Sequence, residues 1–382
     1  MARFGHASVS RMGLSLLQVR RRINSAPRIR HDNGENDSAT NRHTRAINPR
    51  RHPHGWLAML ALLVLGAPLA ATAATLLGAT MGTTYRLILP SLASPDTRLK
   101  TRVDGLLARI NGQMSTYQAD SELSRLNASP SGEWLAVSAD LFEVLKAAHA
   151  VSVASDGAFD ITVGPLVDLW GFGPSPQLAR PPQPDALAAA RARVGYRQLE
   201  LADGPPRVRK ARADLALDLS AIAKGYAVDQ VAALLENAGL HDYLIDIGGE
   251  LRVAGQRRPG QAWQVGVALP SAEREGLERV LPLTNNALAT SGDYRNYFDY
   301  GGRRYSHEID PATGQPLQHA LASVSVLHAS CMWADAYATA LLVMGPQRGL
   351  ALATRQHLAA LFLVRTPAGF TAYHTPGFPP PR

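Results

Sequence analysis

Apolar residues recur along the chain with two spacings, one close to the turn of a helix and one of every second residue. The first spacing places apolar side chains on one face of a helix, and the second places them on one face of a strand. Helical spacing occurs in six stretches, which we predict to be helices: residues 97–115, 138–155, 185–193, 224–240, 331–345 and 347–356. Ser138 is suited to begin the second helix, and Gly239 to end the fourth.

Alternation of apolar and polar residues predicts strands between these helices. They are expected at 83–89, 213–222, 241–255 and 262–270, in the region up to residue 328, and as a hairpin over 358–374. Hairpins and helices follow one another without the regular strand–helix–strand alternation of a doubly wound parallel sheet. We therefore predict an α+β fold with antiparallel sheets and flanking helices. It forms one domain over residues 75–375, and a Pro-rich tail over 376–382 should fray.

The net charge of the chain is concentrated in its first residues. Residues 1–54 contain eleven arginines, no lysine and three acids, which accounts for the whole net charge of +8. Because the remainder is neutral, charge gives no support for a nucleic-acid-binding surface. We interpret residues 1–55 as a disordered Arg-rich leader, with a start codon assigned too early as the alternative.

An export signal is predicted directly after this leader, in residues 56–74. Arg50 and Arg51 precede an apolar run of about a dozen residues and a small-x-small cleavage site at Ala71-Thr72-Ala73. The run is too short for a comfortable membrane span. We expect a periplasmic protein, either released by cleavage or held at the inner membrane by an uncleaved signal anchor. The Sec and Tat export routes both remain open.

Cys331 is the only cysteine of the chain. An internal disulfide is therefore excluded, and the exported domain must be stabilised by its apolar core. No cysteine lies near the cleavage site, which disfavours a lipid anchor. For Cys331 itself, structural packing is favoured over a role as nucleophile.

Four aspartates lie in apolar surroundings: Asp160, Asp218, Asp310 and Asp335. A buried carboxylate is costly without a partner, so these acids indicate either turn caps or a shared site. Asp335 and Thr339 are four positions apart in a helical run, so their oxygens share one face. A hard cation such as Mg²⁺ or Ca²⁺ would bind such oxygens. Alternatively, Asp335 is a favourable negative charge near the helix N-terminus, and the Thr339 hydroxyl donates a hydrogen bond to a backbone carbonyl.

Asp218, Ser220 and Lys224 cluster where a predicted strand passes into a predicted helix. Free N–H groups at a helix start attract anions, and a lysine adds a positive charge, so this junction suits a diphosphate. An ordinary helix cap with a solvated lysine is the alternative. The P-loop, G-x-G-x-x-G, H-E-x-x-H and G-x-S-x-G motifs are all absent from the sequence.

Eight blocks of the sequence together resemble the ApbE family in their order and spacing. They are MGTTY (81–85), MSTYQADSELSRLN (114–127), FDITVGPLVDLWGFG (159–173), DLSAIAKGYAVD (218–229), LIDIGGEL (244–251), ATSGDYRNYF (289–298), HEIDPATGQP (307–316) and ADAYATALLVMG (334–345). The resemblance covers about residues 75–365 and implies an α+β, T-fold-like architecture. Members of the family are FAD:protein FMN transferases.

The resemblance implies a reaction that depends on Mg²⁺, with Ca²⁺ as another candidate ion. FMN would pass from FAD to a Ser or Thr hydroxyl of an acceptor protein, and AMP would be released. The acceptor is expected to be a flavoprotein subunit of a membrane redox complex. Two other functions stay open: a metal-dependent FAD pyrophosphatase giving FMN and AMP, and a non-enzymatic periplasmic flavin-binding maturation factor.

The resemblance also implies the residues of the site. Metal ligands would be Asp335, Thr339 and the backbone carbonyl of Ala221, while Ala338 stands where many relatives carry a further acid. FAD contacts would come from Met81, Tyr117, Ala158, Phe159, Asp160, Asp218, Lys224 and Ile309, with Gly248, Gly249, Ser291 and Gly292 as positions of close backbone approach. His307 and Asp310 are the candidate general bases, and His307 would lie beside the diphosphate.

Overall fold

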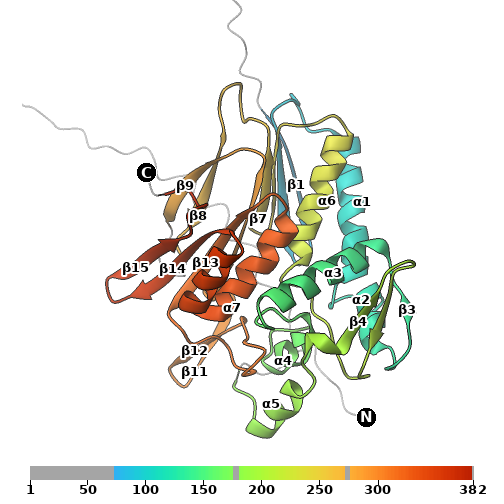
Figure 1. Cartoon of the computed structure of the whole chain (residues 1–382). Coiled ribbons are helices and arrows are strands. Elements are labelled where there is room, and N and C mark those ends of the chain that lie inside the picture. Colours follow the sequence, from blue (N-terminus) through green and yellow to red (C-terminus); the bar gives the residue numbers. More distant parts are fainter. Residues whose placement is uncertain (1–72, 175–179, 272–275, 381–382) are drawn as a thin grey trace, which may run out of the picture. The chain divides into compact units, whose positions relative to one another are not determined.

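The computed structural model describes residues 73–174, 180–271 and 276–380. Its largest element is an eight-stranded antiparallel sheet in the order β1-β2-β6-β7-β10-β13-β14-β15 (Figure 1). The strands are β1 (Ala74–Thr80), β2 (Thr83–Leu89), β6 (Tyr243–Ile247), β7 (Glu250–Ala254), β10 (Asn286–Gly292), β13 (Leu321–His328), β14 (Ala359–Thr366) and β15 (Gly369–His374). The predicted leader, and the signal segment up to residue 72, lie outside the described residues.

Helices cover one face of this sheet. The strands β1 and β2 alternate between buried and more exposed positions, whereas β13 is buried at nearly every position. Leu76, Leu87 and Ile245 are buried in one apolar cluster with side chains of α1 (Thr97–Met114) and α6 (Ala223–Asn237). Further along the sheet, β13 and β14 pack against α7 (Cys331–Arg355), and α3 (Ala139–Ala154) lies against α1 and α7. These helices lie in one layer against the sheet (Figure 1), and α6 and α7 contribute residues to the candidate site.

The opposite face of the sheet is only partly covered. The hairpin of β8 (Trp263–Ala268) and β9 (Leu277–Leu283) packs there, and Trp263 and Val265 join Leu244 and Val253 in a separate apolar cluster. Ile88 of β2 packs against the same cluster. The sheet therefore has two cores, one on each side, and the second is the smaller.

Smaller elements surround the helical layer. They are α2 (Glu122–Ala128), the short helices η1 (Ile161–Val163), α4 (Gly164–Leu169), α5 (Pro184–Arg191) and η2 (Tyr196–Gln198), the three-stranded sheet of β3 (Leu135–Ala136), β5 (Arg207–Lys210) and β4 (Leu199–Ala202), and the hairpin of β11 (Tyr297–Tyr300) and β12 (Arg303–Ser306). Trp170, Phe298 and Tyr305 stack on one another and join the hairpin to α4.

The α+β class, the antiparallel sheet and the predicted helices are confirmed. Ser138 caps α3 as expected, since its Oγ accepts a hydrogen bond from the Leu141 N–H. The two helices predicted at 331–345 and 347–356 both form and follow one another in α7. The helix is interrupted between them at Gly345, which has a φ of 77°. In the part of the chain that the structure describes, no helix is long and apolar enough to cross a membrane.

The strand predicted at 213–222 is wrong, and β1 was not predicted. Residues 215–219 run without regular structure, because side chains rather than a neighbouring strand satisfy the backbone. The Asn127 amide donates to the Leu217 carbonyl at 2.9 Å and accepts from the Leu217 N–H at 2.8 Å. The Lys210 ammonium donates to the carbonyls of Ala213 and Leu215 at 2.9 and 3.3 Å.

The Pro-rich tail does not fray where the structure describes it. Phe378 is buried, at 1% exposure, beneath the guanidinium of Arg279. Arg279 also donates a hydrogen bond to the Pro379 carbonyl at 3.0 Å. One aromatic side chain in the tail is therefore enough to anchor residues 376–380 on the β8–β9 side of the sheet.

Candidate functional site

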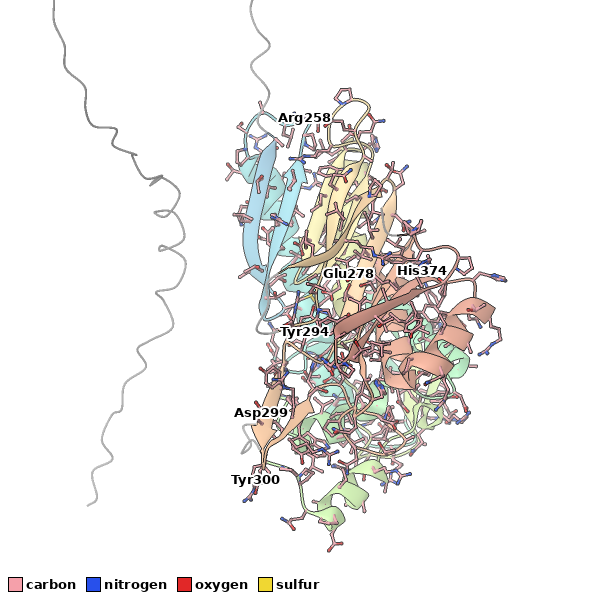
Figure 2. All side chains as sticks on the ribbon, turned by 90° about the vertical axis from the view of Figure 1, so that its left-hand side faces the viewer. Arg258, Glu278, Tyr294, Asp299, Tyr300 and His374 are labelled. Atoms are coloured by element: carbon pink, nitrogen blue, oxygen red, sulfur yellow. The ribbon has the colours of Figure 1, made fainter. Side chains whose placement is uncertain are left out.

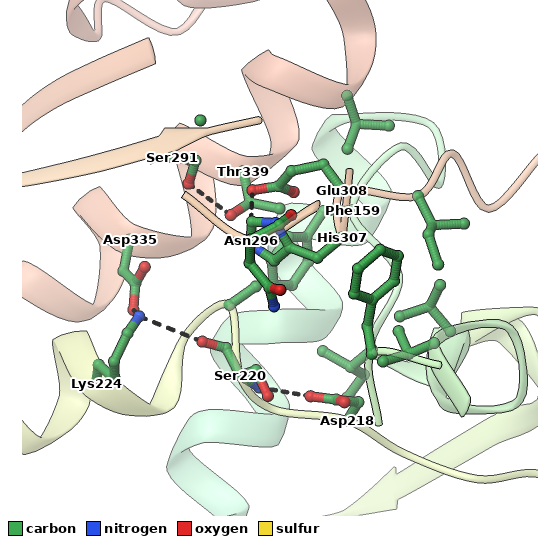
Figure 3. Close-up of a pocket in the computed structure, with 18 of the residues that line it drawn as sticks. Phe159, Asp218, Ser220, Lys224, Ser291, Asn296, His307, Glu308, Asp335 and Thr339 are labelled. Atoms are coloured by element: carbon green, nitrogen blue, oxygen red, sulfur yellow. Dashed lines mark hydrogen bonds and ion pairs between the residues drawn. The ribbon is translucent and has the colours of Figure 1, made fainter. Parts of the chain in front are cut away.

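A cavity of about 340 Å³ opens between the helical layer and the loops beside it (Figure 3). Most of the predicted site residues line it: Tyr117, Ala158, Phe159, Asp160, Asp218, Ala221, Lys224, Gly248, Ser291, Gly292, His307, Ile309, Asp335 and Thr339. These residues come from stretches far apart in the chain, which the fold brings into one cleft. The volume lies in the range of small-molecule sites.

The cleft is built on the close approach of α6 to α7. Gly225 is placed where a Cβ atom would lie 2.4 Å from the Cys331 carbonyl oxygen and 2.8 Å from the Asp335 Cβ, so only glycine fits. The Gly225 N–H donates to the Asp335 carboxylate at 3.0 Å. Close packing and a backbone donor thus hold a buried acid beside the start of α6.

Lys224 is the positive group that faces the buried acids of the cleft. Its ammonium lies 3.2 Å from the Glu250 carboxylate and 3.9 Å from that of Asp335. Burial acts to lower the pKa of Lys224, but the two carboxylates outweigh it and raise the pKa above its usual value. The same burial raises the pKa of Glu250 to about 7 and that of Asp335 above its ordinary range, although Lys224 opposes both shifts.

Thr339 lies one helical turn after Asp335 and faces the same cleft. Its hydroxyl is 2.8 Å from the Ser291 hydroxyl of β10, so a predicted metal ligand and a predicted FAD contact meet directly (Figure 3). Ala338 points elsewhere, because its methyl group is fully buried in the apolar cluster between α7 and the sheet. Position 338 does not contribute to the cavity lining, so the lining loses no oxygen because this residue is alanine.

The oxygens of the cleft suit a hard cation. Asp335, Thr339 and Ala221 line one cavity, and the carboxylate, hydroxyl and carbonyl oxygens that they carry are the kinds of ligand that Mg²⁺ and Ca²⁺ prefer. One buried oxygen of Glu250 has no hydrogen-bond partner among the described residues. Within 73–174, 180–271 and 276–380, no three His, Cys, Asp or Glu side chains are grouped to hold a metal. A metal here would thus rely on the hydroxyl and carbonyl oxygens as well.

The junction before α6 has the character expected of an anion site, although no strand leads into it. Asp218 accepts a hydrogen bond from the Ser220 N–H at 2.8 Å, and its own N–H donates to the Ile161 carbonyl at 2.7 Å. Ile222 precedes the helix and supplies no side-chain cap. The Ala223 N–H donates to the Leu219 carbonyl at 2.9 Å and the Gly225 N–H to Asp335. Lys224, which lines the cavity, is therefore the positive group that this junction offers to an anion.

Of the two candidate bases, only His307 lines the cleft. Its Nδ1 lies 3.1 Å from the Asn296 carbonyl oxygen and its Nε2 3.7 Å from the Glu308 carboxylate. Asp310 lies outside the lining and is occupied by its own turn. One of its oxygens accepts from the Ala312 N–H at 2.9 Å and the other from the Thr313 hydroxyl at 3.0 Å. The Asp310 carboxylate is therefore engaged in its own turn, and its role as a base stays a prediction.

Three of the predicted FAD contacts need qualification. Asp160 lines the cavity, but its carboxylate accepts hydrogen bonds from Thr162 and from the Tyr196 N–H, so its side chain fixes the local fold. Met81 and Gly249 lie outside the lining. Met81 occupies the β1–β2 turn with φ of 47°, and Gly249 borders a neighbouring hollow on the sheet.

Sequence reasoning did not select Glu250, Glu308 and Arg295, which also line the cleft. Glu308 is almost fully buried, and burial raises the pKa of its carboxyl. Both acids stand inside blocks quoted for the family resemblance, directly after the glycine pair and directly after His307. For Glu250, the sequence feature that could have indicated a site residue was an acid at the start of a predicted buried strand.

Comparisons with known proteins agree with this geometry. A model of the ApbE family matches residues 81–362. A FAD:protein FMN transferase of Vibrio cholerae is 43% identical over 330 residues, which cover 85% of this chain and 98% of that protein. One of Haemophilus influenzae is 40% identical over 311 residues, covering 80% and 90%.

Solved structures give the same result. The flavin transferase ApbE from Vibrio cholerae superposes with a TM-score of 0.73 at 43% identity, covering 80% of this chain and 97% of that one. The apo form of the Pseudomonas stutzeri flavinyl transferase ApbE gives a TM-score of 0.73 at 41% identity, covering 80% and 95%. The fold and the sequence therefore resemble the same group of proteins.

Proposed function

The chain belongs to the ApbE family and is a FAD:protein FMN transferase, and we propose that the cleft around Lys224 binds FAD and Mg²⁺ for this reaction. The observation that carries the proposal is the position of Lys224, beside two buried carboxylates at the start of α6. A diphosphate bound there would meet the Lys224 ammonium and a metal ion held by the oxygens of Asp335 and Thr339.

Asp335, Thr339 and the Ala221 carbonyl would hold the metal ion. When bound, Mg²⁺ would neutralise charge on the diphosphate and make AMP a better leaving group. Lys224, whose ammonium lies 3.9 Å from the Asp335 carboxylate, would bind the diphosphate beside the metal ion. Ser291 fixes the hydroxyl of Thr339 through their 2.8 Å contact. Each of these groups is held before the substrate arrives, which reduces the cost of reorganisation.

His307 is the proposed general base. If Nδ1 donates to the Asn296 carbonyl at 3.1 Å, Nε2 is free to accept the proton of the acceptor hydroxyl. That hydroxyl oxygen then forms a bond to the phosphorus of the FMN half, and the bond between this phosphorus and the oxygen of AMP breaks. Glu308 lies 3.7 Å from Nε2 and would stabilise the imidazolium that results.

The acceptor and the place of the reaction are also proposals. We propose a Ser or Thr hydroxyl on a flavoprotein subunit of a membrane redox complex as the target, reached in the periplasm. Support for export comes from the apolar run and cleavage pattern ending at Ala73. The strand β1 begins at Ala74, so cleavage there would leave the described fold complete at its first strand.

Incubation with FAD, Mg²⁺ and such a subunit tests the proposed function. The subunit should gain the mass of FMN and remain fluorescent through denaturing electrophoresis, and alanine at the target hydroxyl should abolish both signals. Release of FMN and AMP without an acceptor, as fast as the transfer itself, would favour the pyrophosphatase instead. Tight FAD binding with neither reaction would favour the maturation factor.

A further inference from the structure

Within the part of the chain that the structure describes, no element covers one part of the sheet beside the cleft. Leu77 of β1 lies opposite Arg86 of β2, and Arg86 lies opposite Asp246 of β6, so the three form one row across the strands. Their neighbours in sequence, such as Leu76 and Leu87, are buried against the helices on the other side. The row therefore points away from the helical layer.

The β8–β9 hairpin covers this side of the sheet only in part. Ile88 and Leu244 pack into the cluster beneath the hairpin, whereas Leu77 is 60% exposed. We call the uncovered part the open face and define it by the side chains or backbone that line one hollow: Leu77, Thr84, Arg86, Asp246, Gly249 and Arg295. Tyr294, next to Arg295, lies between Glu278 of β9 and Asp299 of the β11–β12 hairpin (Figure 2).

The open face is continuous with the FAD cleft. Gly248 and Arg295 line both hollows, so the glycine turn between β6 and β7 forms their common edge. A narrower groove beneath the β8–β9 hairpin shares Arg86, Asp246 and Arg295 with the open face. A chain lying on the open face would thus reach the cleft without crossing covered surface.

The charge of the open face is positive. Arg86 and Asp246 form a half-exposed pair with 3.4 Å between nitrogen and oxygen. Arg295 stacks on the Tyr294 ring at 5.6 Å and has no ion pair with a described residue. One guanidinium is therefore available to a partner, and a carboxylate is the group that it binds best.

We propose that the acceptor protein docks on the open face, with the segment that carries its target hydroxyl lying across Leu77 and Arg86 and one of its carboxylates against Arg295. This rests on the proposed function. A Ser or Thr hydroxyl is only two bonds from the backbone, so the acceptor backbone itself must come to the mouth of the cleft. The open face offers an apolar contact, a charge and a direct path there.

A cross-linking experiment tests the position of the acceptor. The only native thiol, Cys331, is buried, so an introduced cysteine carries a thiol-specific photo-cross-linker selectively. Leu77→Cys places it on the open face, and Val153→Cys, at 57% exposure on α3, is the matched control. The probe is an acceptor subunit that has already gained FMN in the transfer assay.

The proposal expects Leu77→Cys to capture the acceptor in good yield and Val153→Cys to leave it free. It is overturned if capture is equal at both positions or absent from Leu77→Cys, or if Leu77→Cys joins two enzyme molecules or its own chain instead. Both variants are first shown to transfer FMN, so a failure of docking is separated from a failure of the proposed function.

A charge reversal gives an independent readout. Arg86 lies outside the FAD cleft lining, so Arg86→Glu should raise the KM for the acceptor roughly tenfold or more while the KM for FAD stays unchanged. Arg197→Glu reverses an arginine that is 74% exposed on another part of the fold and should change neither constant. An unchanged acceptor KM in Arg86→Glu contradicts the proposal.

Discussion

Lys224 determines whether the acids of the cleft can stay charged. Its ammonium is within 4 Å of both Glu250 and Asp335, and both of these side chains are nearly fully buried. Removing one partner of a buried ion pair leaves an uncompensated charge, which costs far more than the pair contributes. The stability of the fold and the affinity for a diphosphate therefore depend on the same side chain.

Lys224→Met should lower the free energy of unfolding by about 3 kcal/mol, because two buried acids lose their cation. FAD binding should weaken strongly in the same variant. Denaturant unfolding and titration of FAD fluorescence measure the two effects. Lys146→Met is the control, because Lys146 pairs with Asp203 at the surface, where such pairs contribute about 0–1 kcal/mol. Equal losses in the two variants would count against the role of Lys224.

Glu250 should make the ligand-free protein less stable as the pH rises. Burial raises the pKa of Glu250 to about 7 from 4.5, so between these values the folded state keeps a proton that the unfolded chain has released. Stability then falls as pH rises through this window. In the Glu250→Gln variant, the melting temperature should change less between pH 4.5 and 7.5 than it does in the wild type. Parallel curves for the two proteins would exclude this titration.

At the scale of single residues, part of the candidate site could be predicted from the sequence. Asp335 and Thr339 could be paired because helical spacing places their oxygens on one face. Glu250 could not be connected to Lys224 in this way, because their contact joins α6 to β7. The position of Asp310 in a turn could not be predicted either, because a turn acid and a catalytic acid look alike in sequence until their hydrogen bonds are known.

At the scale of elements, the cleft depends on the approach of α6 to α7. The pattern predicted both helices, since each buries one apolar side over several turns. It could not predict their separation, which Gly225 sets by lacking a side chain. The segment 213–222 was misread because its backbone is satisfied by Asn127 and Lys210, and alternation of apolar residues does not reveal such partners.

Gly225→Ala should disturb the contact between these helices. Its Cβ would clash with the Cys331 carbonyl, so we expect a loss of about 1–3 kcal/mol in unfolding free energy and loss of FMN transfer. Gly105→Ala is a matched control in α1, where a Cβ meets nothing within 4 Å. There alanine should stabilise the helix by about 0.5–1 kcal/mol. Unimpaired transfer in Gly225→Ala would show that the close approach is dispensable.

At the scale of the whole molecule, the match to the family lies almost entirely within the part of the chain that the structure describes. The family model matches residues 81–362, and the first strand begins at Ala74. The eight quoted blocks predicted a domain of about this length, because the blocks coincide with the elements that line the cleft. The open face could not be predicted, since it depends on which part of the sheet the β8–β9 hairpin leaves uncovered.

A protein beginning at Ala74 should keep the melting temperature and the rate of FMN transfer of the full chain. The reason is that the family model begins at residue 81 and the first strand of the sheet begins at Ala74. Thermal unfolding and the transfer assay, run on both proteins, check this. A shortened protein that unfolds at lower temperature would show that the leader contributes to the fold.

The central claim is that Asp335 and Thr339 hold a metal at the diphosphate of FAD, and the mass of the acceptor tests it most directly. With FAD and increasing Mg²⁺, the wild-type enzyme should add one FMN to the acceptor, and a chelator should prevent this. Asp335→Asn should add none at any Mg²⁺ concentration, while Asp203→Asn, an exposed control, should match wild type. An acceptor labelled by Asp335→Asn at the wild-type rate and with the same Mg²⁺ dependence would contradict the account.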